Sequence, residues 1–186
     1  MGKTEVIEAL SKAGCLLHGT FKLSSGKTSN LYVDVRRLYS HPVELKVVVA
    51  ELAELIKQFN CDYIAGVESG GIPLATLCSY ILDKPLIYVR KKPKEHGTQK
   101  MIEGHVESKG AVAVVVDDVA TTGSSILKAV AVLREAELEV RDALVVIDRE
   151  EGAESALNNN GVALHALLKL KELVYAFHTS LNSPSS

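Results

Sequence analysis

The amino-acid sequence predicts an α/β fold in which a central parallel sheet is flanked by helices. Its 186 residues fit one domain with a substantial apolar core. Short apolar segments alternate with segments of helical periodicity, which is typical of a doubly wound sheet. The segments 112–116 and 143–147 show no polar alternation, as expected for strands that helices cover on both faces.

The individual elements follow from these patterns in chain order. Residues 4–13 and 43–58 place apolar side chains at helical spacing, and residues 31–35 between them alternate like a strand. Beyond these the predicted strands span 62–67, 86–89, 112–116, 143–147 and 164–168, and the predicted helices span 72–82 and 126–133. Right-handed crossovers would place the helices on both faces, so ligands are expected beyond the carboxyl ends of the strands.

Composition excludes several classes of protein. The chain has 21 Lys and Arg against 23 Asp and Glu, which excludes a globally basic nucleic-acid binder. No apolar run approaches the roughly 20 residues that cross a bilayer, and the N-terminus lacks the apolar core of a signal peptide. The widely spaced Cys15, Cys61 and Cys78 are interpreted as buried hydrophobic residues in a reducing compartment. We therefore expect a cytoplasmic protein that binds neither nucleic acid nor membrane.

The strongest candidate site follows the predicted strand 112–116. Two adjacent carboxylates, Asp117 and Asp118, precede a loop of Thr, Gly and Ser that opens the next helix. Gly123, converging N–H groups, hydroxyl donors and a helix N-terminus suit a phosphate monoester. The carboxylates would repel that phosphate unless they accept hydrogen bonds from a vicinal diol, so the segment predicts a ribose 5-phosphate site. Helix capping alone is the less favoured interpretation, and no complete GxxxxGK[ST] motif supports a P-loop.

A second candidate site is the basic segment after the predicted strand 86–89. Residues 84–100 contain six Lys and Arg and one acid, and Pro93 and Gly97 argue against a helix. Its position at a strand's carboxyl end favours a pyrophosphate-like polyanion site over a solvated surface. Glycines within and after the segment would let it move as a lid. Residues 90–110 contain no aromatic side chain on which a base could stack.

Two further candidates follow other predicted strands. Arg149 could bind a carboxylate or phosphate, or it could form a surface ion pair with Glu150 or Glu151. The loop 68–73 could hold a second phosphate group or be a plain strand-to-helix turn. The residues alone leave these alternatives open. No histidine pair has a metal-ligand spacing.

Several segments together resemble a known family. Val114–Ser125 resembles the phosphoribosyl-pyrophosphate (PRPP) motif of type I phosphoribosyltransferases. Arg90-Lys-x-x-Lys-x-His96-Gly with Ile102-Glu-Gly104 resembles the mobile loop of the orotate phosphoribosyltransferases. The resemblance extends from about residue 21 to about residue 168, and it includes Phe21-x-Leu-x-Ser-Gly26, Tyr32-x-Asp34 and Asp148-Arg149.

This resemblance implies a type I phosphoribosyltransferase fold for residues 1–178. A small hood would be formed by about 1–40 and 149–178, and 179–186 would be a flexible tail. The implied activity is that of a glycosyltransferase (a pentosyltransferase) in pyrimidine (UMP) biosynthesis, which converts orotate and PRPP into orotidine 5′-monophosphate and pyrophosphate. The family also implies Mg²⁺ held mainly through PRPP, with no direct protein ligand, and a homodimer whose active sites are shared across subunits.

The resemblance also assigns roles to individual residues. Asp117, Asp118, Lys91 and Lys94 would be catalytic, and Thr121 and Arg149 would bind orotate. PRPP would be bound by Arg90, Lys91, Lys94, His96, Asp117, Asp118, Val119, Ala120, Thr121, Thr122, Gly123, Ser124 and Ser125.

Two positions depart from the family pattern, because Ser24 and Gly70 stand where many members carry lysine. PRPP affinity would then depend more on backbone N–H groups and on the basic segment. Two other functions stay open at this point. The chain could transfer the ribose group to a purine, or it could be a PRPP sensor without activity, as in some transcriptional regulators. Only about 20 residues precede the matched region, which is too few for a helix-turn-helix domain.

Overall fold

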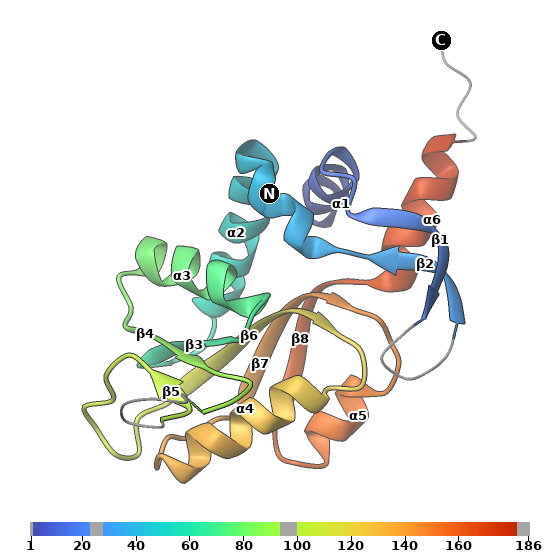
Figure 1. The fold of residues 1–186 in the computed structure, drawn as a ribbon. Coiled ribbons are helices and arrows are strands. Elements are labelled where there is room, and N and C mark those ends of the chain that lie inside the picture. The colour runs from blue at the N-terminus through green and yellow to red at the C-terminus, as the bar shows by residue number, and fades with distance from the viewer. Residues whose placement is uncertain (1, 23–27, 94–99, 182–186) are drawn as a thin grey trace.

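The computed structural model describes residues 2–22, 28–93 and 100–181. Its central layer is a six-stranded sheet in the order β5-β4-β3-β6-β7-β8, in which only the pair β4–β5 is antiparallel (Figure 1). The strands are β3 (Tyr63–Val67), β4 (Leu86–Val89), β5 (Ile102–Glu103), β6 (Ala113–Ala120), β7 (Asp142–Asp148) and β8 (Ala163–Lys169).

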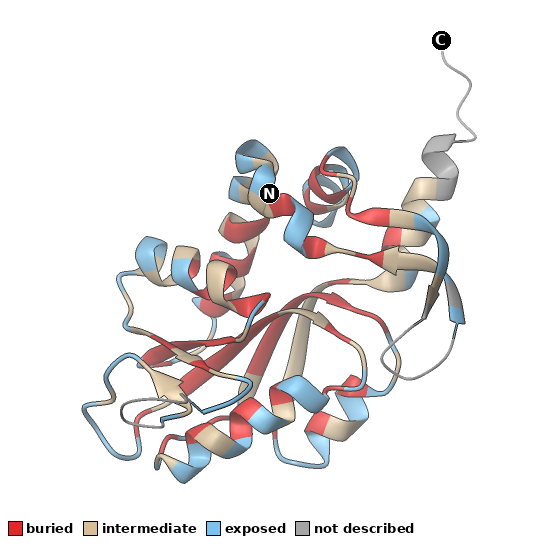
Figure 2. Ribbon diagram, viewed as in Figure 1, coloured by how far each residue is buried: buried red, intermediate tan, exposed pale blue. Residues whose placement is uncertain are grey.

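Helices cover both faces of this sheet, which confirms the predicted fold class (Figure 1). One face packs against α1 (Lys3–Lys12), α2 (Pro42–Ile56) and α3 (Gly71–Leu82), and the other against α4 (Ser124–Glu135) and α5 (Ala153–Asn158). The central strands are buried along most of their length (Figure 2). This burial on both sides explains why their sequences are continuously apolar.

A smaller unit lies apart from the main sheet, on its carboxyl-end side (Figure 1). It contains the antiparallel hairpin β1 (Leu16–Lys22) and β2 (Thr28–Val33), followed by the 3₁₀ helix η1 (Val35–Ser40). Lys3 of α1 forms an ion pair of 2.7 Å with Glu172 of α6 (Leu170–Leu181), so the first and last helices are joined here. α5 and β8, which fall inside the second predicted hood segment, belong to the main layers instead.

Some element boundaries differ from the sequence prediction. β6 does not end at Val116 but continues to Ala120, because Asp117, Val119 and Ala120 pair with β7. Pairing with a neighbouring strand outweighs the low strand propensity of aspartate. α6 continues to Leu181, so the first residues of the predicted tail 179–186 are helical.

The cysteines and the helices bear on the class of protein that the sequence predicts. The three cysteines are free and buried, as predicted. Among the residues that the structure describes, no helix has both the length and the apolar character needed to span a membrane.

The packing of α2 on the sheet generates a stability prediction. Val48 is fully buried, whereas Val43, in the first turn of the same helix, is 69% exposed. Val48→Ala should lower the free energy of unfolding by about 2 kcal/mol, because it deletes buried methyl groups and leaves a cavity. Val43→Ala should change it by less than about 0.5 kcal/mol. Urea denaturation of both variants measures the difference, and equal effects would contradict this packing.

Candidate active site

The candidate residues gather at the carboxyl ends of β3, β6 and β7. Gly71, at the start of α3, lies directly on β6, and a Cβ there would overlap the carbonyl oxygen of Val116. On the other side, the Arg149 N–H donates a hydrogen bond of 2.9 Å to the Ala120 carbonyl. Parallel pairing thus brings the loop after β3, the acidic end of β6 and the residue after β7 to one edge of the sheet.

The predicted phosphate loop runs from Thr121 to the first turn of α4. Gly123 adopts a φ of +78° and lies against Ala153, so both its conformation and its surroundings favour glycine. The side chains of Thr122, Ser124 and Ser125 are exposed. The loop therefore presents hydroxyl groups and the N-terminus of a 12-residue helix to solvent, a combination that attracts an anion.

The two aspartates make different contacts. Asp117 is only 5% exposed, and its carboxylate accepts hydrogen bonds from the Asp118 N–H at 2.9 Å and the Ser125 hydroxyl at 3.2 Å. Asp118 is half-buried and accepts a hydrogen bond from the Val119 N–H at 2.9 Å. Burial raises the pKa of Asp117 well above its ordinary value, and the neighbouring Asp118 charge raises it further. The pair therefore holds its second negative charge with difficulty unless a ligand compensates it.

The loop after β3 is packed against this pair. A Cβ on Gly70 would overlap the carboxyl group of Asp118. A lysine at position 70 would therefore fit only with the Asp118 carboxyl group in another orientation. The other departing position, Ser24, lies outside the described residues.

The basic segment begins beside the same loop. The Lys91 N–H donates a hydrogen bond of 2.6 Å to the Glu68 carboxylate, and the Arg90 guanidinium forms an ion pair of 3.3 Å with Glu103. Lys94 and His96 lie outside the described residues.

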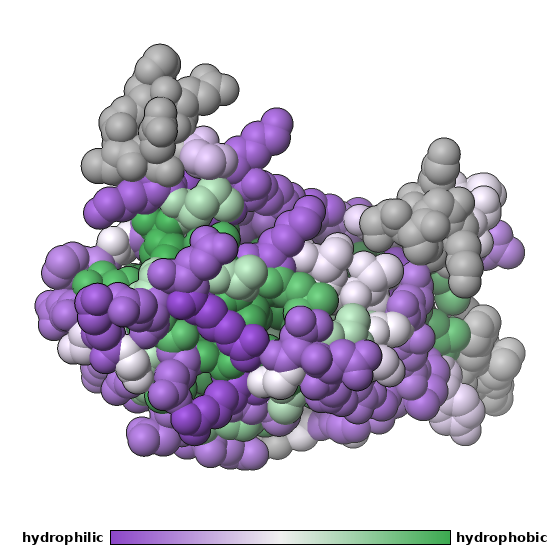
Figure 3. Space-filling view, turned by 90° about the horizontal axis from the view of Figure 1, so that it is seen from below, coloured by the Kyte–Doolittle hydropathy of each residue, from purple (hydrophilic) through white to green (hydrophobic). Residues whose placement is uncertain are grey.

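A cavity of about 460 Å³ brings the start of the basic segment together with the phosphate loop. Figure 3 shows the molecule from below, where apolar residues are visible between charged ones. The cavity is lined by Val67, Glu68, Val89, Arg90, Lys91, Met101, Ser124, Ser125, Lys128, Ala129, Ala131 and Val132.

Arg149 combines features of both interpretations that the sequence left open. It pairs with Glu151 at 2.8 Å, yet it is 7% exposed and is therefore not a surface residue. Within the described part of the chain, the Nη groups of Arg149 have no hydrogen-bond partner in the protein. Every fully buried side-chain nitrogen or oxygen in that part of the chain does have a partner, so the Nη groups are not fully buried. The Nη groups therefore keep contact with solvent. A guanidinium fixed through Nε with its Nη side open is suited to a planar anion.

Sequence reasoning included Glu68 in the candidate loop 68–73 without foreseeing its contact, and it missed Tyr39. Glu68 anchors the backbone of Lys91, and the Tyr39 hydroxyl donates a hydrogen bond to the Gly70 carbonyl. Glu68 directly follows a predicted strand, which is a usable signal. Tyr39 belongs to no recognisable motif. Among the described residues, no group of three or more His, Cys, Asp or Glu side chains is arranged to hold a metal ion.

The fold and the site define a class, the phosphoribosyltransferases, and residues 34–160 match the family model described as a phosphoribosyl transferase domain. The chain is 42% identical to the orotate phosphoribosyltransferase of Pyrococcus horikoshii over 94% of both chains. It is 45% identical to that of Methanocaldococcus jannaschii, over 92% of this chain and 96% of the relative. The crystal structure of the Aeropyrum pernix orotate phosphoribosyltransferase has a TM-score of 0.86 at 41% identity, covering 94% of this chain and 98% of that chain. The chain belongs to the orotate phosphoribosyltransferase family.

The raised pKa of Asp117 generates a prediction about stability. An acid whose pKa is higher in the native than in the unfolded state binds more protons when folded, so stability falls as the pH rises above about 4. Asp117→Asn removes this dependence. The variant should therefore gain stability relative to the parent protein as the pH rises, so the difference in Tm between variant and parent should be larger at pH 8 than at pH 5. Thermal unfolding between pH 5 and pH 8 checks this, and a constant Tm difference would contradict it.

Proposed function

We propose that the chain transfers the ribose 5-phosphate group of PRPP to orotate, giving orotidine 5′-monophosphate and pyrophosphate. The observation that carries the proposal is the pair Asp117–Asp118 at the end of β6, between the N-terminus of α4 and the buried Arg149. Family membership supports the choice of orotate, since the relatives at 42% and 45% identity bear that name.

On the PRPP side, Thr121–Ser125 bind the 5-phosphate through hydroxyls and N–H groups, and Asp118 accepts hydrogen bonds from ribose hydroxyls. Pyrophosphate meets the loop 68–71 and the basic residues that begin at Arg90. In the reaction the bond from C1 to the pyrophosphate oxygen breaks and the pyrophosphate keeps the electron pair. A ring nitrogen of orotate bonds to C1, and the proton that this nitrogen loses passes to the departing pyrophosphate or to water. Positive charge develops at C1, and the nearby carboxylates stabilise it.

The acids present fit the limited role expected for protein groups toward Mg²⁺. Asp117 and Asp118 are two adjacent carboxylates at a predicted phosphate site, and Mg²⁺ is commonly bound by one or two carboxylates together with substrate phosphates. When bound, the cation neutralises charge that develops on the leaving pyrophosphate. The cation would be held mainly through PRPP, and the carboxylate of Asp117, which is enclosed and bonded to Ser125, would not be a direct ligand.

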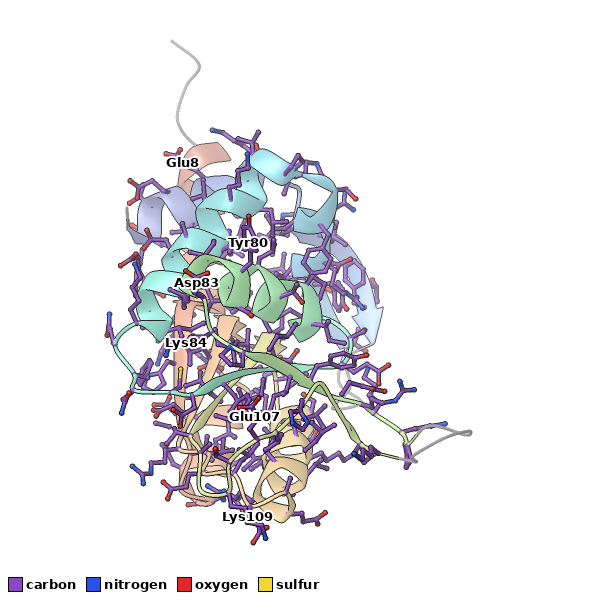
Figure 4. The ribbon with its side chains drawn as sticks, turned by 90° about the vertical axis from the view of Figure 1, so that its left-hand side faces the viewer. Glu8, Tyr80, Asp83, Lys84, Glu107 and Lys109 are labelled. Carbon is purple, nitrogen blue, oxygen red and sulfur yellow. The ribbon has the colours of Figure 1, made fainter. Side chains whose placement is uncertain are left out.

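The proposal extends to a cytoplasmic homodimer. Tyr80 projects from the outer side of α3 and is 83% exposed (Figure 4), and Ile81 beside it is half exposed. Large apolar side chains exposed together are common at interfaces between subunits. The free cysteines fit a reducing compartment.

A steady-state assay with Mg²⁺, PRPP and one base at a time tests the function. We expect loss of the ultraviolet absorbance of orotate, and no turnover of adenine, hypoxanthine or uracil. Turnover of a purine would retain the PRPP site and reject the assignment of Arg149. PRPP binding without turnover of any base would favour a sensor, and retention of DNA at low salt would then be examined.

The position of Arg149 generates a separate prediction. Arg149→Gln should raise the KM for orotate at least about tenfold, because charge-assisted hydrogen bonds to its carboxylate are lost. The KM for PRPP should change less than about twofold. Arg141→Gln is the matched control, since Arg141 pairs with Glu139, also two residues away, but lies on the surface. Equal effects of the two variants on orotate would reject this role for Arg149.

A further inference from the structure

Tyr39 links the smaller unit to the loop that faces the acidic pair. It lies in η1, and this short helix is fixed because its residues Val35 and Leu38 are fully buried. The Tyr39 hydroxyl donates a hydrogen bond to the carbonyl of Gly70, 31 residues further along the chain. Burial raises the pKa of the Tyr39 hydroxyl, and the nearby Asp118 and Asp117 raise it further, so the group keeps its proton as a donor.

Gly70 is enclosed from two sides. Its carbonyl meets Tyr39, and its Cα lies against the carboxyl group of Asp118, so that a Cβ would overlap that group. Gly70 also directly precedes the first turn of α3. The hydrogen bond from Tyr39 therefore fixes both the distance of this loop from Asp118 and the direction of its carbonyl.

We propose that Tyr39 is a positioning residue for PRPP, which holds the loop 68–71 at a fixed distance from Asp118. The inference rests on the proposed function, because it takes PRPP as the ligand. Tyr39 acts through Gly70 and needs no contact with the reacting atoms. Without its hydroxyl, the loop and the carboxylate pair are no longer held in one arrangement, so binding of a ligand that spans both should weaken.

The chain offers a matched control for removal of one phenol hydroxyl. Tyr63, at the opposite end of β3 from this loop, accepts a hydrogen bond of 3.0 Å from the backbone N–H of Glu107, a residue labelled in Figure 4. Tyr63→Phe and Tyr39→Phe each remove one hydrogen bond between a phenol and the backbone. Only the hydrogen bond of Tyr39 reaches a residue of the candidate active site.

The experiment compares both variants with the parent protein. Tyr39→Phe should raise the KM for PRPP roughly three- to tenfold, the effect of one hydrogen bond. Its kcat and its KM for orotate should each change less than about twofold, and Tyr63→Phe should leave all three values within that limit. A Tyr39→Phe protein with a lowered Tm and an unchanged KM for PRPP would show a merely structural role and overturn the proposal. Equal increases in both variants would also overturn it.

Calorimetric titration with PRPP separates this inference from the proposed function. If the parent protein binds PRPP but turns over no base, the proposed activity fails, while weaker PRPP binding by Tyr39→Phe alone still supports the positioning role. If the parent protein turns over orotate and both variants bind PRPP as tightly as it does, the activity stands and the role of Tyr39 is rejected.

Discussion

The structure depends on holding two adjacent carboxylates side by side at the end of a buried strand, next to a helix N-terminus. Placing like charges side by side at the end of a buried strand is unfavourable, and the raised pKa of Asp117 reflects that cost. The surroundings of the pair reduce the cost. Ser125 and the Asp118 N–H donate to the enclosed carboxylate, and the N-terminus of α4 brings a partial positive charge close to it. The N-terminus of α4 and the loop before it therefore lie where they stabilise the negative charge of the pair.

The basic groups at the strand ends are each paired with an acid. Arg149 is held by Glu151, Arg90 is held by Glu103, and Glu68 binds the backbone of Lys91. Each cation or basic segment is therefore fixed by an acid before any substrate arrives. Such prior orientation lowers the entropy lost when an anion binds. It also limits the excess of positive charge in a chain whose net charge is −2.

Much of this arrangement could be predicted from the sequence, for identifiable reasons. β6 and β7 are recognised because both of their faces are buried, which leaves continuous apolar runs. β1 was missed because Gly19 and Lys22 interrupt its apolar pattern, and most of its described residues are exposed or only partly buried. The extension of β6 through Asp117 was missed because it depends on pairing with β7. The residues that follow strands gathered as expected, since parallel strands end at one edge.

The contact between Tyr39 and Gly70 could not be predicted in this way. It joins two segments that no periodicity or motif relates, and it exists because η1 packs over the loop after β3. The sequence likewise could not decide whether Arg149 forms a surface ion pair or presents an oriented guanidinium to a ligand. The two cases differ in the burial of the side chain, which only the structure shows.

The close packing of Gly70 against Asp118 makes the acidic pair sensitive to a residue outside its own strand. A Cβ at position 70 would overlap the Asp118 carboxyl group, so any residue larger than glycine requires that side chain to take another orientation. A substitution at position 70 therefore acts on the acidic pair without changing either aspartate.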